Sequence, residues 1–283
     1  MGKIKTFFLM LALMLIFMWF GEMIGGKEGL RTAFWIALAM NFFSYFFSDT
    51  IVLKHYKAKQ VSKNNAPELY KIVERLAKNA QLPMPKVYIV EERVPNAFAT
   101  GRNPKHAAVA ATTGLLELLS DNEIEGVLAH EMSHIKHYDI LTSSVAATFA
   151  AAITMVSRLA GYQTNNSNTN SKKSNNALAT LIGVILMPIA AAIVQFAISR
   201  TREYAADAGS AKLTKHPEWL IAALTKLDSY SKQAVMKNAN TQTAHFFIIN
   251  PFNGIQSNLT SLFATHPSTK DRIDRLEKMT RNL

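Results

Sequence analysis

The stretch that decides the fold is His130-Glu131-Met132-Ser133-His134. Two histidines four residues apart lie on the same helix face, one turn apart, so both imidazoles can reach one metal ion at about 2.0 to 2.1 Å. Glu131 is offset by one residue, close enough to take a proton from an attacking water molecule without binding the ion. Upstream, Ser120 and Glu123 form the Ser-x-x-Glu pattern of a capping box, which predicts that the motif is helical. The sequence therefore predicts a zinc site on a helix.

A zinc site that keeps one position for water needs a third protein ligand. His137 is the nearest candidate, but on an unbroken helix its side chain would have to reach forward to the ion held by His134. No glycine interrupts the helix between these two residues. We therefore interpret His137 as a side chain at the membrane interface rather than as a ligand.

Glu203 is the better candidate for the third ligand. Glu203 and Asp207 are one helical turn apart, so the first can bind zinc while the second accepts the free N–H of a ligating histidine. The alternative is a solvated helix face on which these carboxylates pair with Arg200 and Arg202, and the spacing alone leaves both interpretations open. Membrane geometry supports this choice. His134 lies six residues before the third apolar stretch, at Ile140, and Glu203 lies five residues after the end of the fourth, at Ile198. Both residues should therefore lie at a similar distance from the membrane.

Composition places the chain among membrane proteins that carry a polar part. Of the 283 residues, 49% are hydrophobic and only 18% are charged, and the apolar residues gather into long stretches. The formal charge of +11 does not indicate a nucleic-acid partner, because no basic run is interleaved with aromatic residues, and positive-inside bias explains it more simply. The absence of cysteine excludes disulfide bonds, a thiolate nucleophile and cysteine-ligated zinc.

Four stretches lack charged side chains for about the length that crosses a bilayer, roughly 20 residues. They lie between Lys5 and Glu22, Arg31 and Asp49, Asp139 and Arg158, and Lys173 and Arg200. The third is dominated by Ala, Ser and Thr, so its alternative is a helix buried in protein, although small residues also suit helix packing within a membrane. Pro188 would kink the fourth without excluding it. About four transmembrane helices are expected.

Charge bias sets the predicted orientation. Lys3 and Lys5 precede the first span, and the two polar regions carry most of the other basic residues, so four crossings leave both polar regions and both termini in the cytoplasm. No small-residue cleavage site follows the first apolar run, which is therefore read as an uncleaved anchor. The predicted organisation is a transmembrane hairpin (1–53), a catalytic part with the metal helix (54–139), a second hairpin (140–199) and a catalytic part with the third ligand (200–283).

The first polar region predicts a small sheet beside the metal helix. A helix capped by Asn65 is followed by three strand candidates, Lys86–Val90, Ala97–Thr100 and Ala107–Thr112. The segment Asn96-Ala97-Phe98-Ala99-Thr100 can offer an unpaired strand edge, to which the backbone of a protein or peptide substrate adds as a further strand. Binding of this kind depends little on the sequence of the substrate.

Together these motifs resemble the HtpX family of membrane zinc endopeptidases. The resemblance covers the chain from about Asn96 to Arg275 and rests on four motifs in the family order: Asn96-Ala97-Phe98-Ala99-Thr100-Gly101, the His-Glu-x-x-His helix, Glu203-x-x-x-Asp207 and Thr265-His266-Pro267. It implies an α+β membrane protein with a thermolysin-like, gluzincin catalytic fold and one zinc ion per chain, with Glu203 as third ligand. It also implies cleavage of damaged membrane proteins in quality control, at the cytoplasmic side of a bacterial plasma membrane. The CAAX prenyl proteases share the zinc motifs but resemble a larger chain with more spans.

The predicted reaction is peptide-bond hydrolysis, in which Glu131 takes a proton from water and passes it to the leaving nitrogen. The resemblance places His266 near the site, where it can donate to the developing oxyanion; the alternative is that it only leads into the helix that follows Ser268. A non-catalytic zinc-binding scaffold or chaperone is the competing function, but a structural site needs four protein ligands and no base. A metal transporter would need ionisable residues within its spans.

Overall fold

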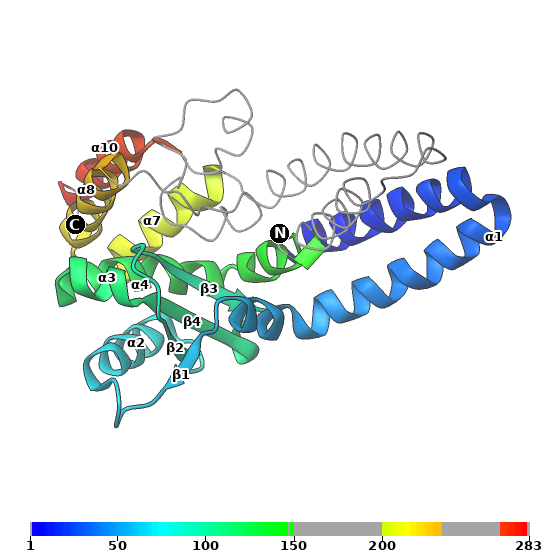
Figure 1. The fold of residues 1–283 in the computed structure, drawn as a ribbon. Coiled ribbons are helices and arrows are strands. Elements are labelled where there is room, and N and C mark those ends of the chain that lie inside the picture. Colours follow the sequence, from blue (N-terminus) through cyan, green and yellow to red (C-terminus); the bar gives the residue numbers. More distant parts are fainter. Residues whose placement is uncertain (1, 147, 150–199, 234–266, 282–283) are drawn as a thin grey trace.

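The computed structural model describes residues 2–146, 148–149, 200–233 and 267–281 (Figure 1). Within these residues the chain forms a long helical hairpin, a four-stranded mixed sheet, and helices that pack around the sheet and one another. The hairpin projects away from the sheet, and the helices around the sheet form the other end of the molecule (Figure 1). This arrangement agrees with the predicted combination of an α+β domain and membrane helices.

The helix α1 (Gly2–His55) is a hairpin rather than one straight helix. Gly25 and Gly26 leave the helical conformation, and Gly26 has a φ of +56°, a region that glycine enters without the steric cost of a Cβ. Beyond this turn the two arms approach so closely that a Cβ on Gly29 would lie 2.1 Å from the carbonyl oxygen of Gly21. Glycine at these positions therefore sets both the turn and the spacing of the arms.

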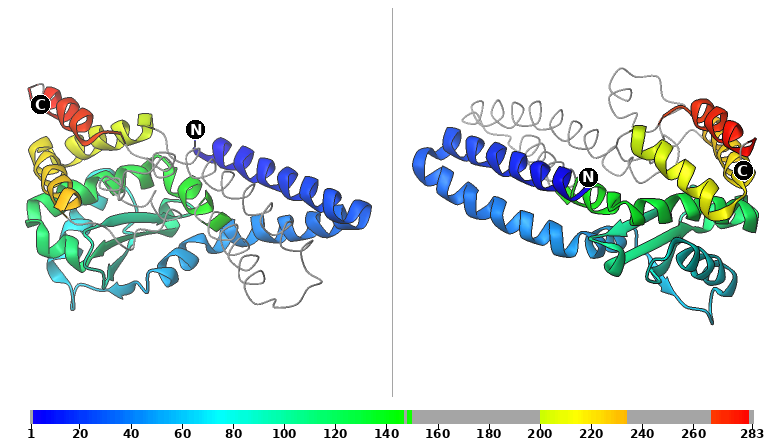
Figure 2. Two further views of the ribbon diagram at one scale, coloured as in Figure 1. Left: turned by 45° about the horizontal axis from the view of Figure 1, so that its top comes forward. Right: turned by 180° about the vertical axis from the view of Figure 1, so that it is seen from behind.

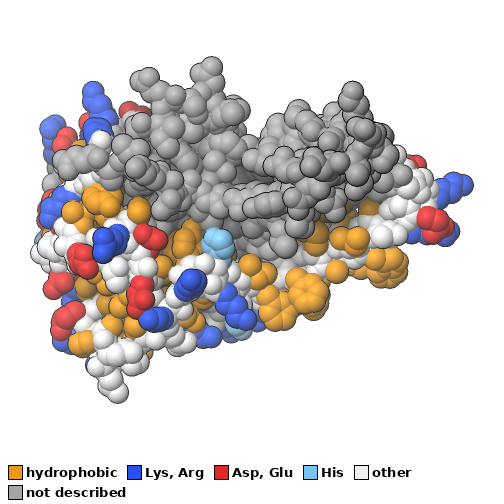
Figure 3. All heavy atoms as spheres, viewed as in Figure 1, with side chains coloured by type: hydrophobic (Ala, Val, Ile, Leu, Met, Phe, Trp, Pro, Cys, Tyr) orange, Lys and Arg blue, Asp and Glu red, His pale blue; other side chains and the backbone are white. Residues whose placement is uncertain are grey.

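Both arms of α1, Ile4–Met23 and Gly25–His55, are long and apolar enough to cross a membrane. Figure 3 shows hydrophobic side chains along the visible face of the hairpin and charged side chains at its tip. Phe7, Trp19 and Trp35 are among the large hydrophobic residues that the arms expose. The arms coincide with the first two predicted spans.

Most of the third and fourth predicted spans lies outside the described residues. At the start of the third, residues 139–146 and 148–149 are helical. Leu141, Val145 and Phe149 of this segment are buried in one cluster with Leu9 and Leu13 of the first α1 arm. The described beginning of the third span thus packs on the first.

The sheet has the strand order β1-β2-β4-β3. Its strands are β1 (Lys59–Val61), β2 (Lys86–Val90), β3 (Ala97–Gly101) and β4 (Ala107–Thr112). The central pair β2–β4 is parallel, whereas β1 pairs antiparallel with β2 and β3 antiparallel with β4. The three predicted strands are confirmed, and β1 was not predicted. Because β3 is at one edge, its outer side has no strand partner among the described residues.

The helix α4 (Asp121–Lys136) lies at the centre of the helical layer and contacts β3, β4 and three further helices. These are α2 (Pro67–Ala80), α7 (Arg200–Thr214) and α8 (Pro217–Gln233), and α10 (Thr269–Thr280) packs on α7 and α8 (Figure 2). The short helices α3 (Thr113–Leu118) and η1 (Pro104–His106) flank β4. Residues distant in the sequence therefore surround one buried helix.

Local sequence explains how α4 begins and how closely its neighbours approach. Both halves of the predicted capping box are present, with Ser120 and Glu123 satisfying each other's backbone N–H groups. A Cβ on Gly126 would lie 2.8 Å from the backbone nitrogen of Leu220, so glycine allows α8 to approach. Ser210 of α7 donates to the carbonyl oxygen of Gly126 at 2.7 Å.

The predicted cap of α2 is wrong. The residue before the helix is Ala66, which makes no side-chain cap. Asn65 instead accepts the backbone N–H of Ser62 at 2.7 Å, and so stabilises the preceding turn. Pro67 begins the helix as expected, because its missing N–H is not needed in the first turn.

Candidate metal centre

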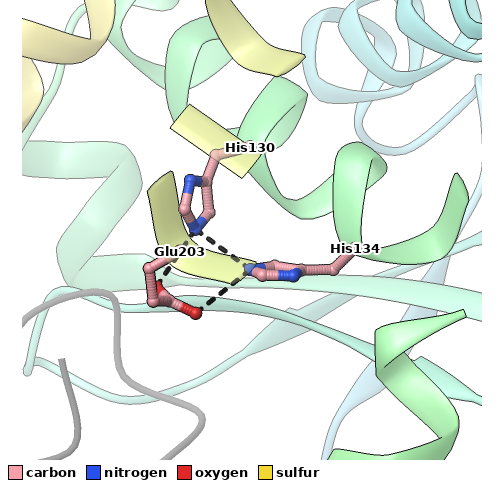
Figure 4. Close-up of side chains that lie close together, drawn as sticks. All are labelled: His130, His134 and Glu203. Carbon is pink, nitrogen blue, oxygen red and sulfur yellow. Dashed lines mark hydrogen bonds and ion pairs between the residues drawn. The ribbon is translucent and has the colours of Figure 1, made fainter. Parts of the chain in front are cut away.

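Three side chains from two helices converge beside the sheet (Figure 4). His130 and His134 come from α4, and Glu203 comes from the first turn of α7. The two Nε2 atoms are 3.2 Å apart, and the Glu203 carboxylate oxygens lie 3.6 Å from His130 Nε2 and 3.5 Å from His134 Nε2. The predicted third ligand is therefore close to both histidines, across a gap of 69 residues from His134 to Glu203.

The separations fit one ion at the centre of the three side chains. Ligand atoms placed about 2.1 Å from a tetrahedral ion lie about 3.4 Å from one another, close to the observed separations of 3.2 to 3.6 Å. Two neutral imidazoles and one carboxylate are the donor set of catalytic sites that keep a fourth position open. These residues can therefore hold a divalent metal ion.

Behind His130 lies a buried carboxylate. Asp207 Oδ1 is 2.9 Å from His130 Nδ1, so the Nδ1 proton is held there and Nε2 is left to face the metal position. Asp207 is itself held by Arg272 of α10, whose Nε and Nη2 donate to the two carboxylate oxygens at 2.9 and 2.7 Å. Arg272 is only 1% exposed, so this three-residue chain lies in the interior.

His134 has a similar arrangement built from different residues. Its Nδ1 lies 3.3 Å from Asp139 Oδ2, and Asp139 Oδ1 lies 3.5 Å from Nη1 of Arg202. Each candidate metal histidine thus has a carboxylate at Nδ1 and an arginine behind the carboxylate. Arg202 and Glu203 are neighbours on α7, so one turn of this helix contributes both a candidate ligand and a support for His134.

Charged groups in the cluster shift one another's pKa values. Burial acts to lower the pKa of His130, but hydrogen bonds to Asp207 and Glu203 outweigh burial and raise this pKa to about 9. Burial acts to raise the pKa of Asp207, but the charge of Arg272 and the bond to His130 lower it to about 2. The buried carboxylates around His130 therefore favour positive charge at this position.

Glu131 lies between the metal cluster and the edge strand. It is 6% exposed, and its Oε2 accepts the backbone N–H of Ala99 in β3 at 2.9 Å. Burial raises the pKa of the Glu131 carboxyl, although the nearby His130 and His134 act to lower it. A carboxylate with a raised pKa is a better proton acceptor near neutral pH.

The other predicted site residues fall into three groups. His137 is exposed at the C-terminal end of α4 and is not part of the cluster. The segment 96–100 is buried beside α4. Asn96 precedes β3, and residues 97–100 belong to it. His266 lies outside the described residues. The solvated-face alternative for Glu203 is wrong, since this residue is 5% exposed and Arg202 pairs with Asp139 instead.

The sequence did not predict three residues that position the histidines through hydrogen bonds and ion pairs. Asp139, Arg202 and Arg272 make their contacts to residues 5, 63 and 65 positions away. Only Asp139 has a local signal, because it lies five residues after His134, just beyond the end of α4. The partners of both arginines depend on tertiary packing.

Residues 63–280, which include the whole cluster, match the family described as Peptidase family M48. The chain belongs to this family of metallopeptidases. It is 60% identical to the Protease HtpX homolog of Campylobacter hominis over 284 residues, the full length of both chains. It is 51% identical to the Protease HtpX homolog of a Sulfurovum species over 279 residues, 99% of this peptidase and 100% of the relative. The predicted HtpX resemblance is confirmed.

A solved structure shares the fold of the peptidase. The crystal structure of S. mikatae Ste24p aligns with a TM-score of 0.52 at 19% sequence identity. The alignment covers 97% of this peptidase and 65% of the length of the Ste24p chain. At this identity the likeness extends to the fold alone.

Proposed function

We propose that this metallopeptidase is a zinc-dependent endopeptidase of the bacterial plasma membrane that cleaves misfolded or damaged membrane proteins at the cytoplasmic side. The observation that carries the proposal is the spacing of His130, His134 and Glu203, whose donor atoms suit one tetrahedral zinc ion. Glu131 beside them is the proposed general base. The relatives named as HtpX protease homologs support a membrane protease.

The chemistry follows from the positions of these residues. A zinc ion held by the three ligands would polarise the scissile carbonyl of a peptide. Glu131, buried and with a raised pKa, accepts the proton of the attacking water and returns it to the leaving nitrogen. Asp207 keeps His130 in the tautomer that directs Nε2 to the ion. His266 is the proposed donor to the oxyanion, on the basis of the family resemblance.

Substrate is proposed to bind along β3. The backbone N–H of Thr112 donates to the carbonyl oxygen of Asn96 at 2.9 Å, so residue 96 faces β4. Because backbone groups alternate in direction along an antiparallel strand, Ala97 and Ala99 direct theirs toward the outer edge. The Ala99 N–H donates to the carboxylate of Glu131. A peptide added along this edge would lie next to the proposed base, as in a thermolysin-like catalytic fold.

The decisive experiment uses the full chain purified in neutral detergent. We expect about one zinc ion per chain, casein cleavage that stops with a chelator, and recovery when zinc is added back. Glu131→Gln should retain zinc but lose about 10² to 10⁴ in turnover, because the ligands remain and the proton acceptor is gone. The exposed Glu117→Gln is the matched control and should leave turnover unchanged. Equal turnover in Glu131→Gln and wild type would remove Glu131 from the mechanism.

The proposed topology has four spans, with both termini and both catalytic parts (54–139 and 200–283) in the cytoplasm. It is supported by the two apolar arms of α1 and by the charge bias. Tags at the termini should be protected in intact cells, whereas a tag beside Asn168 should be accessible. Termini on opposite sides would contradict the four-span topology.

A further inference from the structure

A cavity of about 690 Å³ lies where the α1 hairpin meets the catalytic part of the peptidase. Both α1 arms, the loop after β3, the segment after α2 and the helical segment 139–149 contribute to its wall. Its described lining does not include any candidate metal ligand.

The cavity is cationic on one side. Arg102 and Lys105 are the charged residues among its described lining, and no described carboxylate lines it. The Arg102 guanidinium donates to the carbonyl oxygen of Phe46 at 3.3 Å and lies over the Phe46 ring, which fixes it without neutralising its charge. Neither cation makes an ion pair with a described carboxylate. An anionic occupant would therefore meet two cations that no described carboxylate neutralises.

The membrane helices contribute apolar residues to the wall of the cavity. Phe7 and Met10 lie on the first candidate span, and Tyr45 lies on the second. Arg102 instead comes from the loop between β3 and η1, and Lys105 comes from η1 itself, both in the catalytic part. The lining of the cavity thus combines apolar residues of membrane helices with cations of the catalytic part. A phospholipid has the matching combination of an apolar acyl chain and a charged headgroup.

Hydrogen bonds hold the apolar wall in place. The hydroxyl groups of Thr6 and Thr142 are 2.8 Å apart and buried, which ties the first arm to the helical segment 139–149. Asn41 of the second arm donates to the carbonyl oxygen of Met10 at 3.3 Å. An occupant would enter a formed space between packed helices rather than have to separate them.

We propose that this cavity binds an anionic phospholipid, with its headgroup phosphate between Arg102 and Lys105 and an acyl chain along Phe7 and Met10. The two cations favour a lipid with net negative charge over a zwitterionic lipid, whose amine offsets the phosphate. The apolar wall favours a lipid over free phosphate. This inference concerns a surface separate from the metal cluster and does not depend on the proposed function.

The test measures lipid binding to the full chain in neutral detergent by native mass spectrometry and by lipid titration. The probes are dioleoyl phosphatidylglycerol, dioleoyl phosphatidylcholine, water-soluble dibutyryl phosphatidylglycerol and inorganic phosphate. The variant is Arg102→Gln/Lys105→Gln. The control is Lys78→Gln/Lys86→Gln, which removes two exposed charges that do not line the cavity. Circular dichroism and a monodisperse size-exclusion profile in detergent establish that each variant is folded.

We expect phosphatidylglycerol to bind at least tenfold more tightly than phosphatidylcholine. Each basic residue near a lipid headgroup contributes on the order of fivefold, so the cavity variant should lose about 25-fold and the control less than twofold. Dibutyryl phosphatidylglycerol and inorganic phosphate should compete poorly, because they lack the chain. Equal affinity for the two dioleoyl lipids, equal losses in both variants, or full displacement by inorganic phosphate would each overturn the proposal. If the cavity variant does not fold, Lys105→Gln alone must still lose about fivefold.

Discussion

Arg272 and Asp207 form a two-point ion pair inside the protein, with both carboxylate oxygens held by one guanidinium. Arg272 is 1% and Asp207 2% exposed. The pair joins α10 to α7, and through His130 it also reaches α4. One contact therefore holds together three helices and the orientation of a candidate metal ligand.

Arg272→Ala should destabilise the metal-free peptidase by about 3 to 5 kcal/mol, because it leaves the Asp207 charge buried without its partner. Arg275→Ala is the matched control on the same helix. Arg275 lies over the Tyr204 ring at 3.9 Å, so its loss should cost no more than about 1 kcal/mol. Denaturant unfolding in detergent measures both, and equal effects of the two substitutions would contradict the assigned role of Arg272.

Asp139→Ala should weaken zinc binding roughly 10- to 100-fold, the usual cost of losing a carboxylate behind a metal histidine. Asp121→Ala at the other end of α4 removes an exposed carboxylate far from the cluster and should leave the zinc affinity unchanged. Zinc affinity is measured by competition with a chromophoric chelator. Wild-type affinity in Asp139→Ala would mean that His134 does not depend on this contact.

Glu203→Ala should lose zinc on dialysis against a weak chelator, because it removes one of the three proposed protein ligands. His137→Ala should keep its zinc, since His137 is exposed and outside the cluster. Zinc per chain is measured by atomic absorption after dialysis. Retention by Glu203→Ala together with loss by His137→Ala would reverse the assignment.

Zinc uptake should release protons at neutral pH. The pKa of His130 in the metal-free site is about 9, above its ordinary value of 6.5, so this histidine is protonated at pH 7.5 and must lose its proton to bind zinc. The proton stabilises the metal-free fold fully below about pH 6.5, and this contribution is lost as the pH rises through 9. Calorimetry in buffers of different ionisation heat should detect about one released proton at pH 7.5 and none well above pH 9. No release at pH 7.5 would contradict the raised pKa.

The sequence predicted best those features that depend on neighbours along the chain. The capping box of Ser120 and Glu123, the strands β2, β3 and β4, and the helical turn between His130 and His134 all depend on local spacing. Asn65 shows the limit of this reasoning, because a good capping residue satisfied a nearby turn instead. The strand β1 has three residues and exposed lysine and glutamine, so it lacks a recognisable pattern.

The features that could not be predicted depend on contacts between distant segments. Nothing near Arg202 in the sequence indicates that its partner is Asp139 rather than the adjacent Glu203. Nothing near Arg272 indicates that a charged side chain will be buried, since the surrounding residues of α10 are mostly polar. Both arginines acquire their roles only when α7 and α10 pack beside α4.

The dispersed origin of the metal cluster also has a consequence during synthesis of the protein. The two histidines are made first, Glu203 is made 69 residues after His134, and Arg272 a further 69 residues later. At ordinary translation rates the interval from His134 to Arg272 is on the order of ten seconds. A nascent chain that has not yet reached Glu203 has only two of the three proposed ligands and cannot cleave its neighbours. Dividing the proposed ligands between distant segments would therefore delay proteolytic activity until the segment between them has been made.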